Sequence, residues 1–141
     1  MNCIFNFTRD AVVMGRYGLD NYNHDYKPLY SSKLAVYTIS SGKMEVYKVG
    51  EIQELIACDE YAYVMVYTFL GYGGGYYRIC LSTGETEQIP ETVGLDGVTG
   101  IFVDSDDCVY IQQYHVYSEA RGALYRYDAN TKESTFITWI Y

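Results

Sequence analysis

The amino-acid sequence predicts an all-β protein made of three tandem units, and three observations support this. The segment 34–42 (LAVYTISSG) matches 76–84 (YYRICLSTG) and, more loosely, 124–132 (LYRYDANTK), at offsets of 42 and 48 residues. Apolar residues occur in short runs separated by turn-forming residues, and no long helical period is present. Glycine occurs 13 times and proline only twice. A repeat of about 40 to 50 residues has the length of a four-stranded unit.

Each unit is expected to hold four strands joined by a short turn, a long loop and a tight turn. Asp10, Glu60 and Asp107 fall in the three equivalent first turns, and Gly42, Gly84 and Lys132 close the third turns. We predict a single domain, 1–141, whose units and strands are as follows: unit 3–49 with strands 3–7, 12–17, 33–39 and 44–49; unit 50–90 with strands 54–57, 61–69, 76–81 and 86–89; and unit 97–140 with strands 100–104, 108–116, 123–128 and 134–139.

Alternation along these strands predicts which side chains form the core. Successive side chains of a strand point to opposite faces, so apolar residues at every second position mark a buried face. The expected core residues are Phe5, Leu55 and Phe102 on the first strands, Met14, Val64 and Ile111 on the second, and Ile39 and Leu81 on the third.

The repeated stretch Tyr-Arg, three residues, then Ser/Asn-Thr-Gly/Lys resembles the third strand and turn of TolB-like or Tyr-Trp-Thr-Asp-type β-propeller blades. The resemblance covers about residues 3–140, but the Trp-Asp and Gly-His pairs of WD repeats are absent, and the units do not repeat the double glycine of kelch blades. It implies three blades, whereas closed propellers generally have about four to eight. We therefore expect a half ring that forms a homodimer, or a piece of a longer propeller. A β-sandwich or a set of stacked sheets is the alternative.

Composition limits the partners and the compartment. The net charge of −8 argues against nucleic acid or an anionic membrane as a direct partner. No secretory leader or apolar stretch of membrane-spanning length is present, so we expect a cytoplasmic protein. Its four cysteines show no metal-binding spacing and are expected to be free and inert, with no metal or cofactor. They are Cys3, Cys58, Cys80 and Cys108.

The irregular segments all belong to the second-to-third-strand loops, at 18–32, 71–75 and 117–122, which would gather at one end of the units. These loops are rich in tyrosine, asparagine and glycine, a composition typical of recognition surfaces. The sequence thus predicts a non-enzymatic module that binds a protein or a glycan through this loop face. The candidate binding residues are Asp20, Tyr22, His24, Tyr26, Tyr72 and Tyr117.

Other interpretations of these segments are less well supported. The glycine run 71–75 is followed by a strand and lacks the lysine of a phosphate loop. The acidic segment 104–107 lacks the glycine and distal glutamate of a calcium loop. No nucleophile is linked by sequence to the Asp20, His24 and Asp25 group, so no enzyme activity is predicted. The alternative function is a small acidic inhibitor, of phage or mobile-element origin, that blocks a basic nucleic-acid-binding enzyme.

Overall fold

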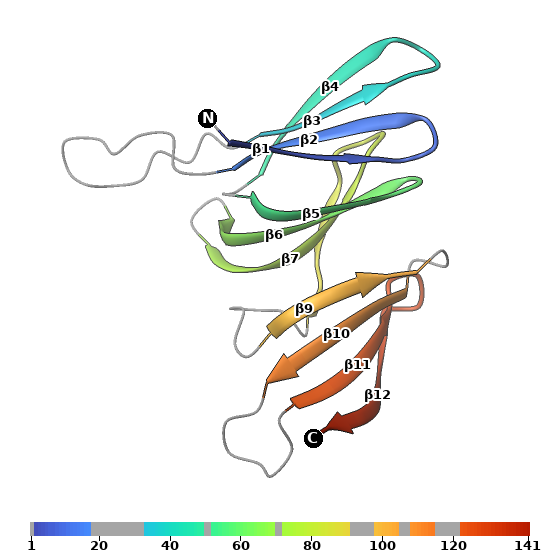
Figure 1. Ribbon diagram of the computed structural model, residues 1–141. Coiled ribbons are helices and arrows are strands. Elements are labelled where there is room, and N and C mark those ends of the chain that lie inside the picture. Colours follow the sequence, from blue (N-terminus) through green and yellow to red (C-terminus); the bar gives the residue numbers. More distant parts are fainter. Residues whose placement is uncertain are drawn as a thin grey trace, which may run out of the picture.

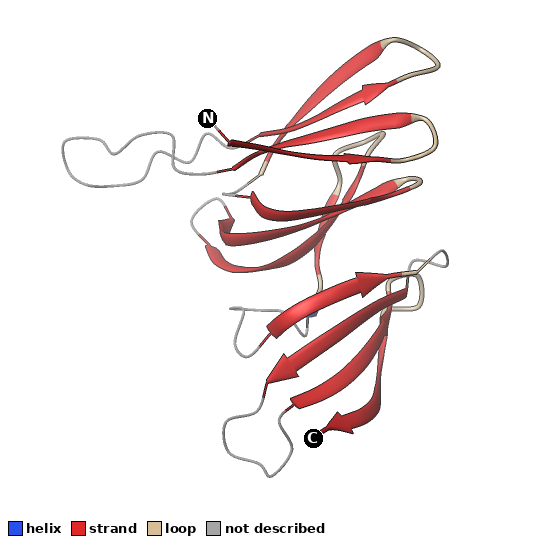
Figure 2. Cartoon of the chain, viewed as in Figure 1, coloured by secondary structure: helices blue, strands red, loops and turns tan. Residues whose placement is uncertain are grey.

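A computed structural model describes residues 2–17, 33–49, 52–69, 72–90, 98–104, 108–114 and 122–141. Strands and the turns between them make up these residues, and no α-helix occurs within them (Figures 1 and 2). The strands are β1 (Asn2–Phe7), β2 (Ala11–Tyr17), β3 (Lys33–Thr38), β4 (Lys43–Lys48), β5 (Ile52–Cys58), β6 (Tyr61–Phe69), β7 (Tyr72–Cys80), β8 (Thr86–Gln88), β9 (Val98–Val103), β10 (Cys108–Tyr114), β11 (Gly122–Asp128) and β12 (Glu133–Ile140).

The strands form three four-stranded sheets, each with its strands in chain order: β1 to β4, β5 to β8 and β9 to β12. Every paired strand is antiparallel to its neighbour. The three sheets follow one another in space as they do along the chain, from β1–β4 at the top of Figure 1 to β9–β12 at the bottom. The predicted all-β fold with three four-stranded, propeller-like units is therefore confirmed.

The glycine run 71–75 is the main departure from the predicted strands. We expected a loop there, but β7 begins at Tyr72, and Gly73 and Gly75 pair with Thr68 and Val66 of β6. Glycine keeps the backbone N–H and C=O groups that a ladder needs, so a glycine-rich segment can continue a strand where a neighbour is available. The long β6–β7 hairpin is the result.

The third turn has the same backbone conformation in all three sheets, as the repeat predicted. Gly42, Gly84 and Lys132 have φ angles of 66°, 76° and 62°. The N–H of each donates to the carbonyl oxygen four residues earlier, at 2.9, 2.8 and 2.7 Å. Glycine adopts this left-handed conformation without penalty, whereas Lys132 adopts it at some cost.

Side chains between neighbouring sheets form two hydrophobic clusters. The cluster between the first and second sheets centres on aliphatic residues, and that between the second and third sheets is richer in tyrosine. Their buried members are Ala11, Val13, Leu34, Val36, Val49, Ile52, Leu55, Ala62, Val64, Val66, Tyr77, Ile79 and Leu81 in the first cluster, and Tyr63, Tyr76, Ile89, Ile101, Val109, Ile111, Tyr127 and Ala129 in the second.

Strand register shows which positions of the three sheets correspond. Phe5 pairs with Met14, Leu55 with Val64, and Ile101 with Ile111. In the second and third sheets these pairs lie on the face that packs against the preceding sheet, and in the first sheet the pair lies on the corresponding outward face. Leu55, Val64, Ile111 and Leu81 are buried as predicted, and Met14 is half-buried.

Three core predictions are wrong, for two physical reasons. Phe5 is 56% exposed and Ile39 is also exposed, because neither of the other two described sheets packs on this face of the first one. Phe102 is 65% exposed because its neighbour Ile101, not Phe102, pairs with Ile111. The side chain of Phe102 therefore lies on the opposite face of the third sheet.

Candidate functional site

The ends of the second strands and the starts of the third strands lie at one edge of the molecule. Tyr17 ends β2, Phe69 ends β6 and Tyr114 ends β10, and all three strands end on the left in Figure 1. The described ends of β2, β6 and β10 therefore lie on the same side of the scaffold.

Most of the predicted binding residues fall outside the residues that the structure describes. Asp20, Tyr22, His24, Tyr26 and Tyr117 are among these. The remaining candidate, Tyr72, begins β7, and its backbone pairs with that of Phe69 at the end of β6. The structure thus places this one candidate at the edge from which the loops leave.

A polar groove lies between the second and third sheets and was missed at the sequence level. Glu87 on β8 lies 3.7 Å from the Nη2 atom of Arg78 and 3.2 Å from the Nζ atom of Lys132. The Tyr127 hydroxyl donates to the same carboxylate at 3.4 Å. The Arg78 guanidinium also stacks on the Tyr61 ring, 4.1 Å from its centroid. Residues of the third sheet thereby bind a carboxylate of the second.

The composition of this groove favours a structural link over a ligand site. Its volume is about 410 Å³, and its lining includes Arg78, Lys132, Glu85 and Glu87, whose formal charges cancel. The Nη1 atom of Arg78 is buried and makes no hydrogen bond to the described part of the chain. The sequence signal for the arginine of this groove was the Tyr-Arg pair, which is repeated at 77–78 and 125–126. Its acidic partner follows from the strand register, in which Arg78 faces Glu87.

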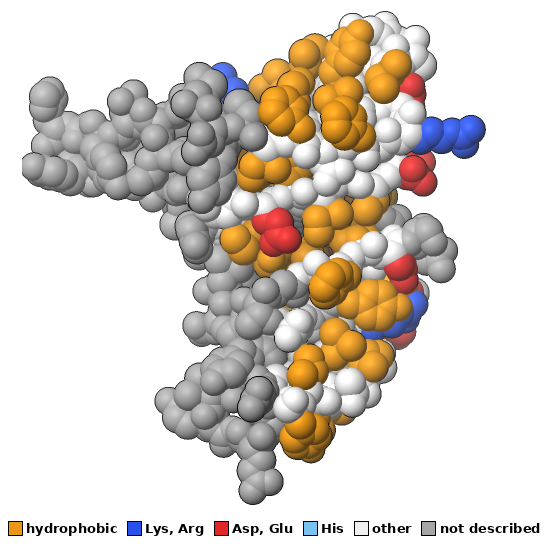
Figure 3. All heavy atoms as spheres, in the orientation of Figure 1, with side chains coloured by type: hydrophobic (Ala, Val, Ile, Leu, Met, Phe, Trp, Pro, Cys, Tyr) orange, Lys and Arg blue, Asp and Glu red, His pale blue; other side chains and the backbone are white. Residues whose placement is uncertain are grey.

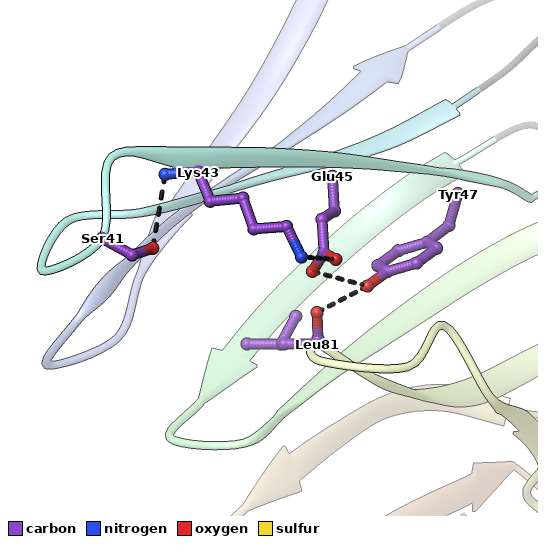
Figure 4. A network of polar contacts seen from close by, with 5 residues as sticks. All are labelled: Ser41, Lys43, Glu45, Tyr47 and Leu81. Carbon is purple, nitrogen blue, oxygen red and sulfur yellow. Dashed lines mark hydrogen bonds and ion pairs between the residues drawn. The ribbon is translucent and has the colours of Figure 1, made fainter.

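A second polar network joins the first and second sheets (Figure 4). The Lys43 ammonium donates to Glu45 at 2.8 Å, and the Tyr47 hydroxyl lies 3.2 Å from the same carboxylate. That hydroxyl donates to the carbonyl oxygen of Leu81 at 2.8 Å. Burial, reinforced by the neighbouring Glu45 carboxylate, raises the pKa of Tyr47 to about 12. Hydrogen bonds from Lys43 and Tyr47 lower the pKa of Glu45.

Three of the cysteines form no disulfide, as predicted, but they differ in surroundings. Cys108 is buried and accepts a hydrogen bond from Arg126, whereas Cys58 and Cys80 are half-buried. Burial raises the pKa of the Cys80 thiol, but hydrogen bonds with Ser82 and Thr83 outweigh it and leave the pKa below its usual value. A lowered pKa increases the thiolate fraction, so Cys80 is the thiol that we expect to react first.

The outward face of the first sheet is apolar across all four strands, and we call it the leading face. Hydrophobic side chains gather over this sheet in Figure 3. The leading face consists of Phe5, Phe7, Val12, Met14, Ala35, Tyr37, Met44 and Val46, which the register places on one side of the sheet, with the paired Lys33 and Lys48 at the end of that side. Five of them are exposed: Phe5, Phe7, Tyr37, Met44 and Val46.

The described residues contain no group of three or more histidine, cysteine, aspartate or glutamate residues placed to hold a metal ion. Within the same residues, no helix is long and apolar enough to cross a membrane.

Comparison with known proteins places the chain by fold alone. No family model matches it, and no curated protein matches it. Among solved structures, the tricorn protease, which has β-propeller domains, superimposes with a TM-score of 0.62 at 14% sequence identity. The match covers 92% of this chain and 12% of the protease chain. The fold is propeller-like. At this identity the match carries no information about activity.

Proposed function

We propose that this protein is a non-enzymatic binding module that recognises a protein or a glycan through loops at one edge of its three sheets. The observation that carries the proposal is the common edge at which β2, β6 and β10 end (Figure 1). A rigid scaffold that gathers several variable loops on one side is a common way to build a binding surface.

The chemistry of these loops supports recognition. Tyr22, Tyr26, Tyr72 and Tyr117 supply aromatic rings with hydroxyl groups, and rings of this kind stack on sugars or pack on protein surfaces at low entropic cost. Asp20 and His24 add polar groups to the same surface. We assign the contact with the ligand to these six residues.

A non-catalytic role fits the side chains available. The sequence has only two histidines, His24 and His115, and neither is linked by sequence to a nucleophile. Cys58, Cys80 and Cys108 form no disulfide, which fits a reducing compartment, and we propose the cytoplasm.

The net charge of −8 favours one other function, inhibition of a basic nucleic-acid-binding enzyme by an acidic surface. The two functions differ in their response to salt. A complex held by many surface charges weakens steeply as salt rises, whereas stacking on tyrosine rings does not.

The test is capture of partners on immobilised protein and on a glycan array, in about 0.15 M and about 1 M salt. The Tyr22→Ala/Tyr26→Ala variant removes two loop rings, and Tyr22→Phe/Tyr26→Phe is the matched control that keeps them. Binding that survives high salt, falls at least tenfold in the alanine variant and persists in the phenylalanine variant supports the proposal. Binding that high salt abolishes and the alanine variant retains supports the acidic inhibitor instead and overturns the proposal.

A further inference from the structure

The leading face of the first sheet corresponds to faces that are covered elsewhere in the molecule. Phe5 occupies the position of Leu55 and Ile101, which are 5% and 4% exposed. Ile39 likewise corresponds to Leu81 and Ala129, which are both buried. The first sheet therefore presents in solution the kind of face that the second and third sheets bury against the unit before them.

The outward face of the third sheet is of the complementary type, and we call it the trailing face. Its Tyr110 and Arg126 are a directly paired couple, as Tyr63 and Arg78 are in the second sheet. Tyr63 and Arg78 belong to the face that packs against the third sheet. The trailing face also carries Phe102, which is exposed, and Leu124, which is half-buried.

The arginine of the trailing face has a counterpart inside the molecule. Arg126 donates to the Cys108 thiol at 2.7 Å, and its equivalent Arg78 stacks on Tyr61, the residue that corresponds to Cys108. The interface between the second and third sheets thus already buries an arginine with this orientation. An arginine at the centre of the trailing face does not prevent the same kind of packing.

We propose that the leading face of one chain packs on the trailing face of a second copy, and that two chains close a six-bladed ring. A two-fold axis makes both contacts at once, so that neither face stays in water. Six blades lie within the range of about four to eight seen in closed propellers. The eight side chains that define the leading face carry no charge, and Lys33 and Lys48 lie at one end of the same side, so its centre fits an apolar sheet face better than a strongly charged partner.

The size of the contact is sufficient for a stable dimer. Four strands about 4.8 Å apart, with about six residues at about 3.3 Å each, give one sheet face a footprint of roughly 400 Å². Two such contacts come to about 800 Å² per chain, which is typical of specific interfaces. This inference is independent of the proposed loop function and is tested without any ligand.

The test is sedimentation equilibrium of the whole chain and of single variants at micromolar concentrations. We expect the wild-type protein to have about twice its 16.2 kDa chain mass. Met44→Glu on the leading face and Phe102→Glu on the trailing face each place a charge in the contact, and both variants are expected to be monomeric. Ser82→Glu, in an exposed turn of the middle sheet, is the control and stays dimeric.

Mixing the two variants tests the pairing of the faces. A mixed dimer of Met44→Glu and Phe102→Glu keeps one intact leading face against one intact trailing face. The mixture is therefore expected to associate at least tenfold more tightly than either variant alone. Circular dichroism confirms the fold of each variant, and Val46→Lys replaces Met44→Glu if that variant unfolds.

Three results would overturn the proposal. The first is a wild-type protein that stays monomeric at about 100 micromolar, a concentration well above the usual dissociation constants of specific homodimers. That result would show that no second copy covers the leading face. Loss of the dimer in Met44→Glu alone, with Phe102→Glu still dimeric, shows that two leading faces meet each other. A dimer that both substitutions leave intact places the interface elsewhere.

Discussion

Tyr37 and Tyr127 occupy the same position on the third strands of the first and third sheets, but Tyr127 is 2% exposed and Tyr37 is 36% exposed. The two side chains have the same chemistry and equivalent partners, Val12 and Val109, on the neighbouring strands. What differs is the sheet that lies against Tyr127. Exposure in this protein therefore depends on the position of a unit in the series as much as on residue type.

The core is tested by Ile111→Ala in the third sheet. Ile111 is fully buried against the second sheet, so removing its side chain leaves a cavity and is expected to lower the free energy of unfolding by about 2–5 kcal/mol. Ile137→Ala is the control, because Ile137 is exposed at the bulge of β12, and its loss is expected to be below about 1 kcal/mol. Urea denaturation followed by circular dichroism gives both values. Equal losses would show that the assigned faces of the third sheet are wrong.

The third turns allow a matched comparison of Gly84→Ala and Gly42→Ala. Both glycines have positive φ, which costs a residue with a side chain about 1–2 kcal/mol. A Cβ atom at Gly84 would also lie 2.3 Å from the Cδ1 atom of Tyr47, whereas at Gly42 the nearest atom, the Tyr37 hydroxyl oxygen, is 3.9 Å away. We expect Gly84→Ala to destabilise the protein clearly more than Gly42→Ala in thermal or urea unfolding. Equal effects would mean that the Tyr47 ring moves aside freely.

Tyr47 makes stability depend on pH in the alkaline range. Its pKa is raised from 10.0 to about 12, so the folded state holds the proton more tightly than the unfolded state does. The stabilisation is therefore complete below about pH 10 and is lost as the pH rises toward 12. We expect the wild-type protein to lose more stability between pH 8 and pH 11 than Tyr47→Phe does, as measured by urea denaturation. A loss of the same size in both proteins would contradict this assignment.

The thiols are expected to react in a fixed order. Cys80 is half-buried and its pKa is lowered, whereas Cys108 is buried beneath Arg126. Iodoacetamide is expected to label Cys80 of the native protein well before Cys108, because the thiolate is the reactive form. After unfolding without reductant, mass spectrometry is expected to find all four thiols alkylated. Faster labelling of Cys108, or a disulfide, would contradict the structure.

The sequence predicted the three sheets because each unit repeats its own turn chemistry. The match of 34–42 to 76–84 reappears as equivalent positive φ angles at Gly42 and Gly84. The sequence could not show which side chains of β9 face the core. Ile101 and Phe102 are both apolar, so alternation alone does not decide which of them is buried. The register with Ile111 makes that choice.

Other features depend on contacts between units, which a single-strand pattern does not contain. Phe5 has the pattern of a core residue, but only the arrangement of the three described sheets shows that neither of the other two covers it. The link of Arg78 to Glu87 and Lys132 likewise requires the second and third sheets to be in place. Five of the six predicted binding residues lie outside the described residues, so their assignment stays a prediction.

Oxidation of Met44 tests most directly whether the leading face of one chain is covered by the trailing face of another. Met44 is exposed in the single chain, and Met65, which packs between the second and third sheets, serves as the internal reference. We expect brief hydroxyl-radical exposure to oxidise Met44 at least fivefold faster in Phe102→Glu than in the wild-type protein, relative to Met65. The substitution lies in the third sheet, so only its effect on a second chain explains such a change. Equal rates of Met44 oxidation in the two proteins would contradict the account.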